Sequence, residues 1–128
     1  MAGYSATPLE RKLGVKPDHV VLLDNAPHGF DLDAPTTRRL PKRLDISLTF
    51  HTRAAALAKR LPQLFERTDQ AGMVWVCWPK KAAKVPTDLD ENVVREIGLA
   101  AGVVDVKVCA IDETWSGLKF VRRLADRT

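Results

Sequence analysis

The sequence predicts an α/β domain of three layers, in which a sheet of about five strands is mostly parallel and ends in an antiparallel hairpin. Two patterns predict it. Short runs of consecutive apolar residues, typical of strands buried on both faces, alternate with segments of helical periodicity. The last two strand-like segments are joined by a short turn-forming stretch. With 128 residues, of which 45% are hydrophobic, we expect residues 1–128 to form a single domain.

The first elements are a short helix and a strand. Within residues 1–17, Thr7 and Glu10 match a capping box and Gly14 is suited to end the helix, so this segment is expected to pack on the domain as a helix. Residues 19–24 contain an unbroken apolar run, which predicts a strand covered on both faces.

The next segment is irregular and leads into the second strand. Residues 25–43 contain three prolines, which leave room for at most a short helix near Phe30. In residues 44–50, apolar and polar residues alternate with a period of two, which predicts a strand with one more polar face. Ser47 and Thr49 are therefore expected on an incompletely covered face, which would leave room for a homodimer.

A helix and the third strand follow. Thr52 is expected to cap the helix, and Pro62 is expected to kink it or split it in two. Gly72 is expected to form the turn before the third strand, residues 73–78.

The last helix and the hairpin complete the fold. Asp88, with Glu91, is expected to begin the helix, and Gly102 to end it. Residues 104–111 and 118–123 are predicted to form the two strands of the hairpin.

Composition argues against several classes of protein. No run approaches the 18 apolar residues of a membrane helix, and the first residues lack the order of a signal peptide, so we expect a cytoplasmic protein without a membrane segment. Cys77 and Cys109 lie in apolar strand patterns without metal-ligand spacing, so no metal site is expected. The net charge of +4 is too modest to indicate a nucleic-acid partner.

Two resemblances follow from motifs. Residues 72–123 resemble the carboxyl-terminal half of class I methyltransferases that use S-adenosylmethionine (SAM), through a Gly-x-strand-Pro segment, a helix, Ala-Gly-Val-Val-Asp-Val and a terminal hairpin. This resemblance implies a shortened Rossmann-like sheet of the methyltransferase type. Nearly the whole chain resembles a family of short actinobacterial proteins of unknown function, through the strings Gly3-Tyr4-Ser5, Trp78-Pro79-Lys80-Lys81 and Asp112-Glu113-Thr114-Trp115-Ser116-Gly117. That second resemblance implies no particular reaction.

The methyltransferase resemblance also implies a cofactor site, which this sequence does not complete. SAM usually binds beside a glycine-rich turn after the first strand, but residues 25–30 contain one glycine, Gly29. The acidic residue that usually binds the ribose lies at the end of a second strand, which follows a full helix. In this sequence, the interval between the first predicted strand and Leu44 is barely long enough for one crossover connection. We therefore predict no cofactor and no catalytic residue.

In open parallel sheets, ligands bind outside the carboxyl ends of the strands. This rule nominates residues at or just after the ends of the first three predicted strands, namely Asn25, His28, His51, Arg53, Trp78, Lys80 and Lys81. The histidines could act as general bases, although no nucleophile or orienting carboxylate is identifiable beside them. The lysines could hold a phosphate or carboxylate beside the indole, and a solvated loop is the alternative.

Two further clusters have a functional and a structural interpretation. The hairpin connection could be a recognition loop or simply a turn; its candidate residues are Asp112, Glu113, Trp115 and Ser116. A basic cluster could contact phosphates, but upstream carboxylates and the lack of a nucleic-acid-binding motif favour a solvated loop; it consists of Arg38, Arg39, Lys42 and Arg43.

The sequence therefore favours a non-catalytic accessory or regulatory domain that binds a protein partner or a small anionic ligand. A small transferase-like enzyme, a degenerate methyltransferase that uses His28 or His51 with Lys80, is the first alternative. A basic nucleic-acid-binding protein is the second.

Overall fold

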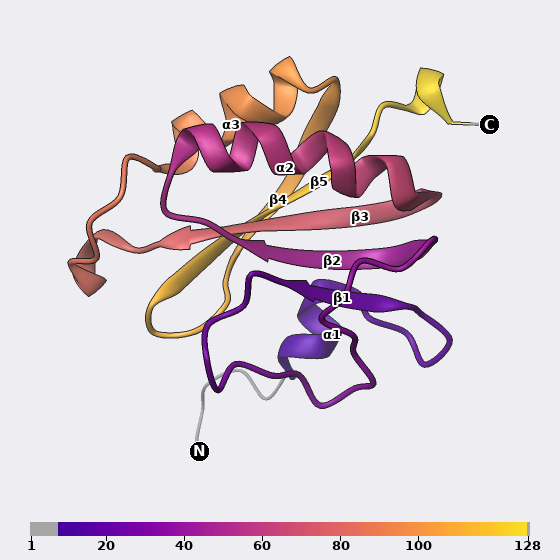
Figure 1. Cartoon of the computed structure of the whole chain (residues 1–128), viewed down its shortest axis with the longest axis horizontal. Coiled ribbons are helices and arrows are strands. Elements are labelled where there is room, and N and C mark those ends of the chain that lie inside the picture. The colour runs from indigo at the N-terminus through magenta and orange to yellow at the C-terminus, as the bar shows by residue number, and fades with distance from the viewer. Residues whose placement is uncertain (1–7, 128) are drawn as a thin grey trace.

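The computed structural model describes residues 8–127 and contains one five-stranded mixed sheet (Figure 1). The strand order is β1-β2-β3-β5-β4. The bounds are Val21–Asp24 for β1, Leu44–Phe50 for β2, Thr68–Pro79 for β3, Val103–Ala110 for β4 and Trp115–Arg122 for β5. The first three strands pair in parallel, and β5 is antiparallel to both β3 and β4. Four strands therefore run in one direction, which confirms the predicted α/β fold with its terminal hairpin.

Two helices cover one face of the sheet, α2 (Ala54–Arg67) and α3 (Glu91–Ala100) (Figure 1). The apolar residues of α2 lie at helical spacing and are buried against the sheet; they are Leu57, Leu61, Leu64 and Phe65. The helix is not split at Pro62: α2 is continuous from Ala54 to Arg67, and Pro62 lies on its exposed side. Gly102, at a φ of 89°, follows α3 as predicted.

The opposite face is covered by α1 (Leu9–Leu13) and by the segment that follows β1 (Figure 1). The buried Trp75 indole of β3 donates to the Leu13 carbonyl at 3.0 Å, which fixes the end of α1 on the sheet. Gly14 ends α1 at a φ of 87°, as expected. The predicted cap, Thr7, lies outside the described residues.

The segment between β1 and β2 contains no helix, so the short helix considered near Phe30 is absent. It returns along the outer edge of β1 instead. The Thr37 N–H donates to the Val21 carbonyl at 2.9 Å, and the Leu23 N–H donates to the Thr37 carbonyl at 2.8 Å. These bonds satisfy backbone groups that an edge strand would otherwise expose.

Helix starts differ from the sequence prediction because one loop caps two helices. Asp90, and not Asp88, accepts a hydrogen bond from the Val93 N–H at 2.9 Å and caps α3. The carboxylate of Asp88 accepts instead from the Ala54 N–H at 2.7 Å, at the start of α2, where Thr52 was expected to act. The side-chain cap of α2 therefore comes from a distant loop.

Tertiary packing also overturned two other expectations, one about Gly72 and one about the face that carries Ser47 and Thr49. Gly72 lies inside β3 and not in a turn; a Cβ there would lie 2.7 Å from the Asp45 carbonyl of β2, so strand packing requires a glycine. Ser47 and Thr49 are fully buried, so the face that suggested a homodimer is covered.

None of the described helices combines the length and the apolarity needed to cross a membrane. Residues 8–127 also contain no cluster of three or more His, Cys, Asp or Glu side chains suited to a metal ion. Both cysteines are free thiols; Cys77 is buried, and its burial raises its pKa well above the ordinary value. Cys109 is half-buried.

Gly98→Ala is expected to destabilise the protein, although alanine is the better helix former. Gly98 is buried where α3 crosses β5, and a Cβ there would overlap the fully buried Phe120 ring. Overpacking of this kind destabilises by about 1–3 kcal/mol. Urea unfolding measures the effect, with Glu96→Ala on the exposed side of α3 as the control. Unchanged or higher stability of Gly98→Ala would contradict the close packing of α3 on β5.

Candidate functional site

The carboxyl ends of β1, β2 and β3 meet at one edge of the sheet because these strands are parallel. The strands end at Asp24, Phe50 and Pro79. A buried polar cluster and two hollows lie at this edge of the sheet. Some of the residues that the sequence nominated belong to the cluster or line a hollow, and others lie outside all three.

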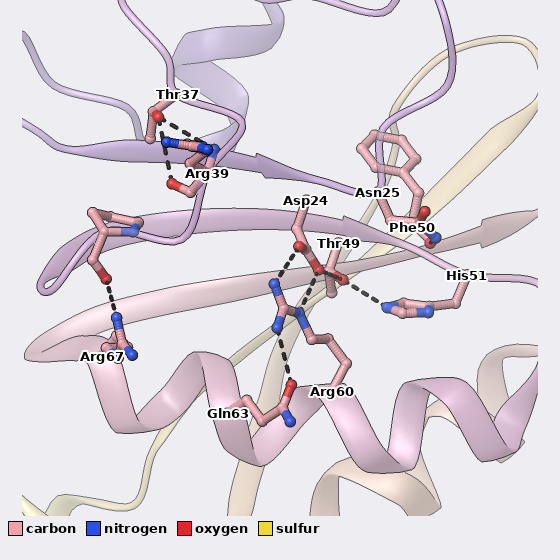
Figure 2. Close-up of polar contacts among 11 residues, drawn as sticks. Asp24, Asn25, Thr37, Arg39, Thr49, Phe50, His51, Arg60, Gln63 and Arg67 are labelled. Carbon is pink, nitrogen blue, oxygen red and sulfur yellow. Dashed lines mark hydrogen bonds and ion pairs between the residues drawn. The ribbon is translucent and has the colours of Figure 1, made fainter.

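The Asp24 cluster consists of Asp24, Thr49, His51 and Arg60 (Figure 2). The Arg60 guanidinium of α2 donates to both carboxylate oxygens of Asp24, at 2.7 and 3.1 Å. The Thr49 hydroxyl donates to the same carboxylate at 2.7 Å, and its oxygen lies 2.6 Å from Nε2 of His51. Asp24 and His51 are only 8% and 7% exposed.

These bonds define the tautomer of His51. The single hydroxyl proton of Thr49 is donated to Asp24, so the Thr49 oxygen can only accept from His51. Nε2 of His51 therefore carries the proton, and Nδ1 is the unprotonated nitrogen of the neutral ring. Within residues 8–127, Nδ1 has no hydrogen-bond partner and is not fully enclosed. Its lone pair is available to a solvent molecule or a ligand.

The environment lowers the pKa of both titratable groups. Burial alone would raise the pKa of Asp24, but the hydrogen bonds from Arg60 and Thr49 and the charge of Arg60 together hold it below its ordinary value of 3.8. Burial lowers the pKa of His51 below 6.5, against the attraction of Asp24, and the Arg60 charge adds to the lowering. The cluster therefore contains an ionised carboxylate and a neutral imidazole at neutral pH.

Two nominated residues have structural positions beside this cluster. Asn25 adopts a φ of 56°, and its side-chain amide donates to the Phe50 carbonyl at 2.6 Å, which links the ends of β1 and β2 (Figure 2). Arg53 is exposed at the start of α2, and its side chain forms no hydrogen bond or ion pair with residues 8–127. Neither residue lines a hollow.

The first hollow, called the Trp78 hollow, has a volume of about 380 Å³ and lies between the end of β3 and the start of α3. Its polar lining comes from Trp78, Lys80, Lys81, Asp90, Glu91, Asn92 and Ser116. The structure thus brings four nominated residues together, two lysines, an indole and a hydroxyl.

The second hollow, called the Trp115 hollow, has a volume of about 520 Å³ and lies between the turn after β1 and the β4–β5 turn. It brings together His28, Asp112 and Trp115 among the nominated residues. Oδ1 of Asp112 accepts from the Thr114 and Trp115 N–H groups, both at 2.8 Å, so the expected turn chemistry is present. Glu113 is exposed and lines neither hollow.

Part of the basic cluster is already paired within the protein. Arg43 forms ion pairs with Asp45 and Asp69 at 3.3 and 3.2 Å, and Arg38 donates to the Phe30 carbonyl. Arg39 and Lys42 remain exposed.

Sequence reasoning found His51 but missed Asp24, Thr49 and Arg60. A carboxylate that ends an apolar strand and a hydroxyl within the next strand were visible signals. The missing information was the position of Arg60, because helical periodicity does not say which strand end lies beneath a given residue of α2.

A scan against protein-family models finds no match for this chain, and a search of curated proteins finds no relative. Solved structures do match. Magnesium protoporphyrin IX methyltransferase from Synechocystis PCC 6803, with bound SAM, aligns with a TM-score of 0.52 and 11% identity over 74% of this chain and 49% of that chain.

Two other structures align similarly. A ribosomal protein L11 methylase from Lactobacillus delbrueckii subsp. bulgaricus gives a TM-score of 0.50 and 15% identity, over 88% of this chain and 62% of that one. LepI in complex with SAM aligns with a TM-score of 0.51 and 11% identity, over 90% of this chain and 39% of that chain. This chain spans less than two thirds of each neighbour, and at these identities the likeness shows a methyltransferase-like fold alone.

The residues after β1 do not fit SAM in the manner that the fold implies. The turn contains Asn25, Ala26 and Pro27 where glycines would allow close approach, and Asp24 is engaged by Arg60 and Thr49. The chain then returns along the β1 edge through Thr37, where the usual fold would form a helix and a second strand.

Asp24→Asn is expected to destabilise the protein by about 1–3 kcal/mol, because it leaves a partly buried Arg60 without its counterion. Asp69→Asn makes the same chemical change at the exposed Arg43–Asp69 pair and is expected to change stability by about 0.5 kcal/mol or less. Urea unfolding of both variants at neutral pH measures the difference. Equal effects would show that the Asp24 cluster contributes no more than a surface ion pair.

Stability is expected to fall on acidification in two windows. The folded pKa of His51 lies below 6.5, so the unfolded chain takes up a proton first and stability is lost as pH falls below about 6.5. The folded pKa of Asp24 lies below 3.8, so its contribution is lost at lower pH, as that carboxylate is protonated. Unfolding free energies of wild type and His51→Gln from pH 7.5 to 5.0 test the first window. A slope that the substitution leaves unchanged would contradict the role of His51.

Proposed function

We propose that the protein is a non-catalytic accessory domain with a shortened methyltransferase-type fold, which binds a small anionic ligand in the Trp78 hollow. The observation that carries this proposal is the set of hydrogen-bond donors that line the hollow without an acidic partner. A protein partner would be recognised by the same donors if it presented a carboxylate or phosphate group.

Four donors support an anion. The Trp78 indole N–H has no acceptor within residues 8–127 and is not fully enclosed, although the side chain is largely buried. The Ser116 hydroxyl and the Lys81 ammonium also have no protein partner within that range. Lys80 donates to the Asp112 carbonyl at 2.6 Å, which satisfies one of its three N–H groups and holds the ammonium in place.

The two carboxylates of the hollow are compensated by other groups. Glu91 forms an ion pair with Arg95 at 2.7 Å. Asp90 caps α3, where the helix dipole favours negative charge. The positive charges of Lys80 and Lys81 have no such partners, because neither lysine forms an ion pair within residues 8–127.

The non-catalytic role is supported by the end of β1. Asp24 is fully engaged by the protein, and the turn that follows does not fit SAM. One observation favours the second candidate, a transferase-like enzyme: His51 has an orienting hydroxyl and carboxylate, and its Nδ1 is unpaired within residues 8–127.

Thermal denaturation with phosphate, pyrophosphate, acetate, SAM and S-adenosylhomocysteine tests both candidates. A ligand at 100 times its dissociation constant stabilises the protein by about 2.7 kcal/mol. We expect saturable stabilisation by at least one simple anion, weakened about tenfold in affinity by Lys81→Gln, since a charge-assisted hydrogen bond is lost.

The matched control is Lys84→Gln, which removes the same charge from an exposed position of the same loop outside the hollow. Equal weakening by the two variants, or no stabilisation by any anion, would refute the anion site. Stabilisation by SAM or S-adenosylhomocysteine that His51→Gln reduces would instead support the enzyme.

A further inference from the structure

The Trp115 hollow has the dimensions of a small-molecule site, and the proposed function does not use it. Its volume of about 520 Å³ is within the range of ligand pockets. The walls are mainly apolar and come from three separate parts of the chain: Leu9 of α1, Pro27 and Phe30 after β1, and Ile111 and Trp115 of the hairpin.

The aromatic walls are held in place by a third ring. Phe50 is 1% exposed and contacts Phe30 edge-on, with ring centroids 4.9 Å apart at 61°. It also contacts Trp115, at 5.1 Å and 87°. The side chains of Phe30 and Trp115 are both half-buried. One part of each packs on Phe50, and another part remains exposed. The walls are therefore preorganised, which reduces the entropy lost when a ligand binds.

Hydrogen bonds also fix the backbone of the hairpin turn. The Ile111 N–H donates to the Trp115 carbonyl at 2.9 Å, and Asp112 Oδ1 receives two N–H groups of the turn. On the other side of the hollow, Asp31 Oδ1 accepts from the Leu32 N–H at 2.8 Å. In each of these two carboxylates, Oδ1 accepts hydrogen bonds from nearby backbone N–H groups. Neither Oδ2 has a hydrogen-bond partner within residues 8–127.

The charge of the hollow is negative. Asp31 and Asp112 line it and form no ion pair within residues 8–127, and no lysine or arginine is part of the lining. Two cations lie close to lining residues, and each donates to a backbone carbonyl: Lys80 to that of Asp112, and Arg38 to that of Phe30. His28, which is exposed, is the remaining titratable residue of the lining.

We propose that the Trp115 hollow binds an organic cation, an ammonium or quaternary ammonium group attached to an aromatic or short aliphatic body. The apolar body packs against Phe30, Ile111 and Trp115, and the cation faces Asp31 and Asp112. A cation that lies over either aromatic ring, Phe30 or Trp115, is also attracted by the ring quadrupole. An organic anion of the same size is excluded by the two carboxylates.

The test compares three probes with the same ring and different charge: phenethylammonium, 2-phenylethanol and 3-phenylpropionate. Titrations into the whole chain at pH 7.5 are followed by ¹H–¹⁵N NMR. We expect phenethylammonium to shift the indole N–H signal of Trp115 saturably and to bind about tenfold more tightly than the neutral alcohol. No saturable shift with phenylpropionate is expected. Equal binding of the alcohol and the ammonium would overturn the proposal.

Isosteric variants locate the charge. Asp31→Asn and Asp112→Asn keep Oδ1 as an acceptor for the turn and remove only the negative charge, so the fold is retained. The double variant is expected to weaken phenethylammonium binding about tenfold. Asp33→Asn, at an exposed position outside the hollow, is the matched control. An unchanged affinity of the double variant would also overturn the proposal.

Cation binding in the Trp115 hollow does not depend on anion binding in the Trp78 hollow. Lys81→Gln alters the Trp78 hollow and is expected to leave phenethylammonium binding unchanged, because Lys81 does not line the Trp115 hollow. Loss of cation binding in that variant would contradict the assignment to the Trp115 hollow.

Discussion

The pairing of Arg60 with Asp24 fixes the end of the sheet at which all of the candidate sites lie. Asp24 is the last residue of a short edge strand, and Arg60 is in the middle of the helix that crosses above it. Their double hydrogen bond ties α2 to β1, and Thr49 extends the connection to His51 in the loop after β2. The same bonds occupy the carboxylate at the end of β1, so the arrangement that orders this edge also removes Asp24 from contact with a ligand.

The hairpin divides the edge into two sites of different chemistry. Trp115 and Ser116 are consecutive residues of β5, and successive side chains of a strand point to opposite faces of the sheet. Trp115 therefore lines the hollow on the α1 side, and Ser116 lines the hollow beside α3. The Trp115 hollow has carboxylates without ion-pair partners and fixed aromatic rings, whereas the Trp78 hollow has lysines and an indole N–H beside carboxylates that other groups compensate. Lys80 links them, because it lines one hollow and donates to the carbonyl of Asp112, which lines the other.

The fold is a shortened form of the methyltransferase-like architecture. The strand order and the terminal hairpin are those of an open sheet between two layers, and the likeness to solved methyltransferases covers less than two thirds of each. On the other side of β1, Thr37 pairs with the edge where a longer sheet would continue. This pairing explains how a four-residue edge strand can be buried throughout.

The sequence alone determined the elements whose signals are local. Consecutive apolar residues identified the buried strands, apolar residues at helical spacing identified α2, and Gly14 and Gly102 marked helix ends because each requires a positive φ. It also identified His51, from its place after a strand. Tertiary structure alone decided which polar residues meet. Asp88 and Asp90 have equal local preference for a cap, and the packing of the loop against α2 selected between them. Ser47 and Thr49 appear exposed in an alternating pattern, but helices cover that face. The partnership of Asp24 with Arg60 depends on where a helix crosses the sheet, which is set by the packing of the whole core and has no signal within either segment.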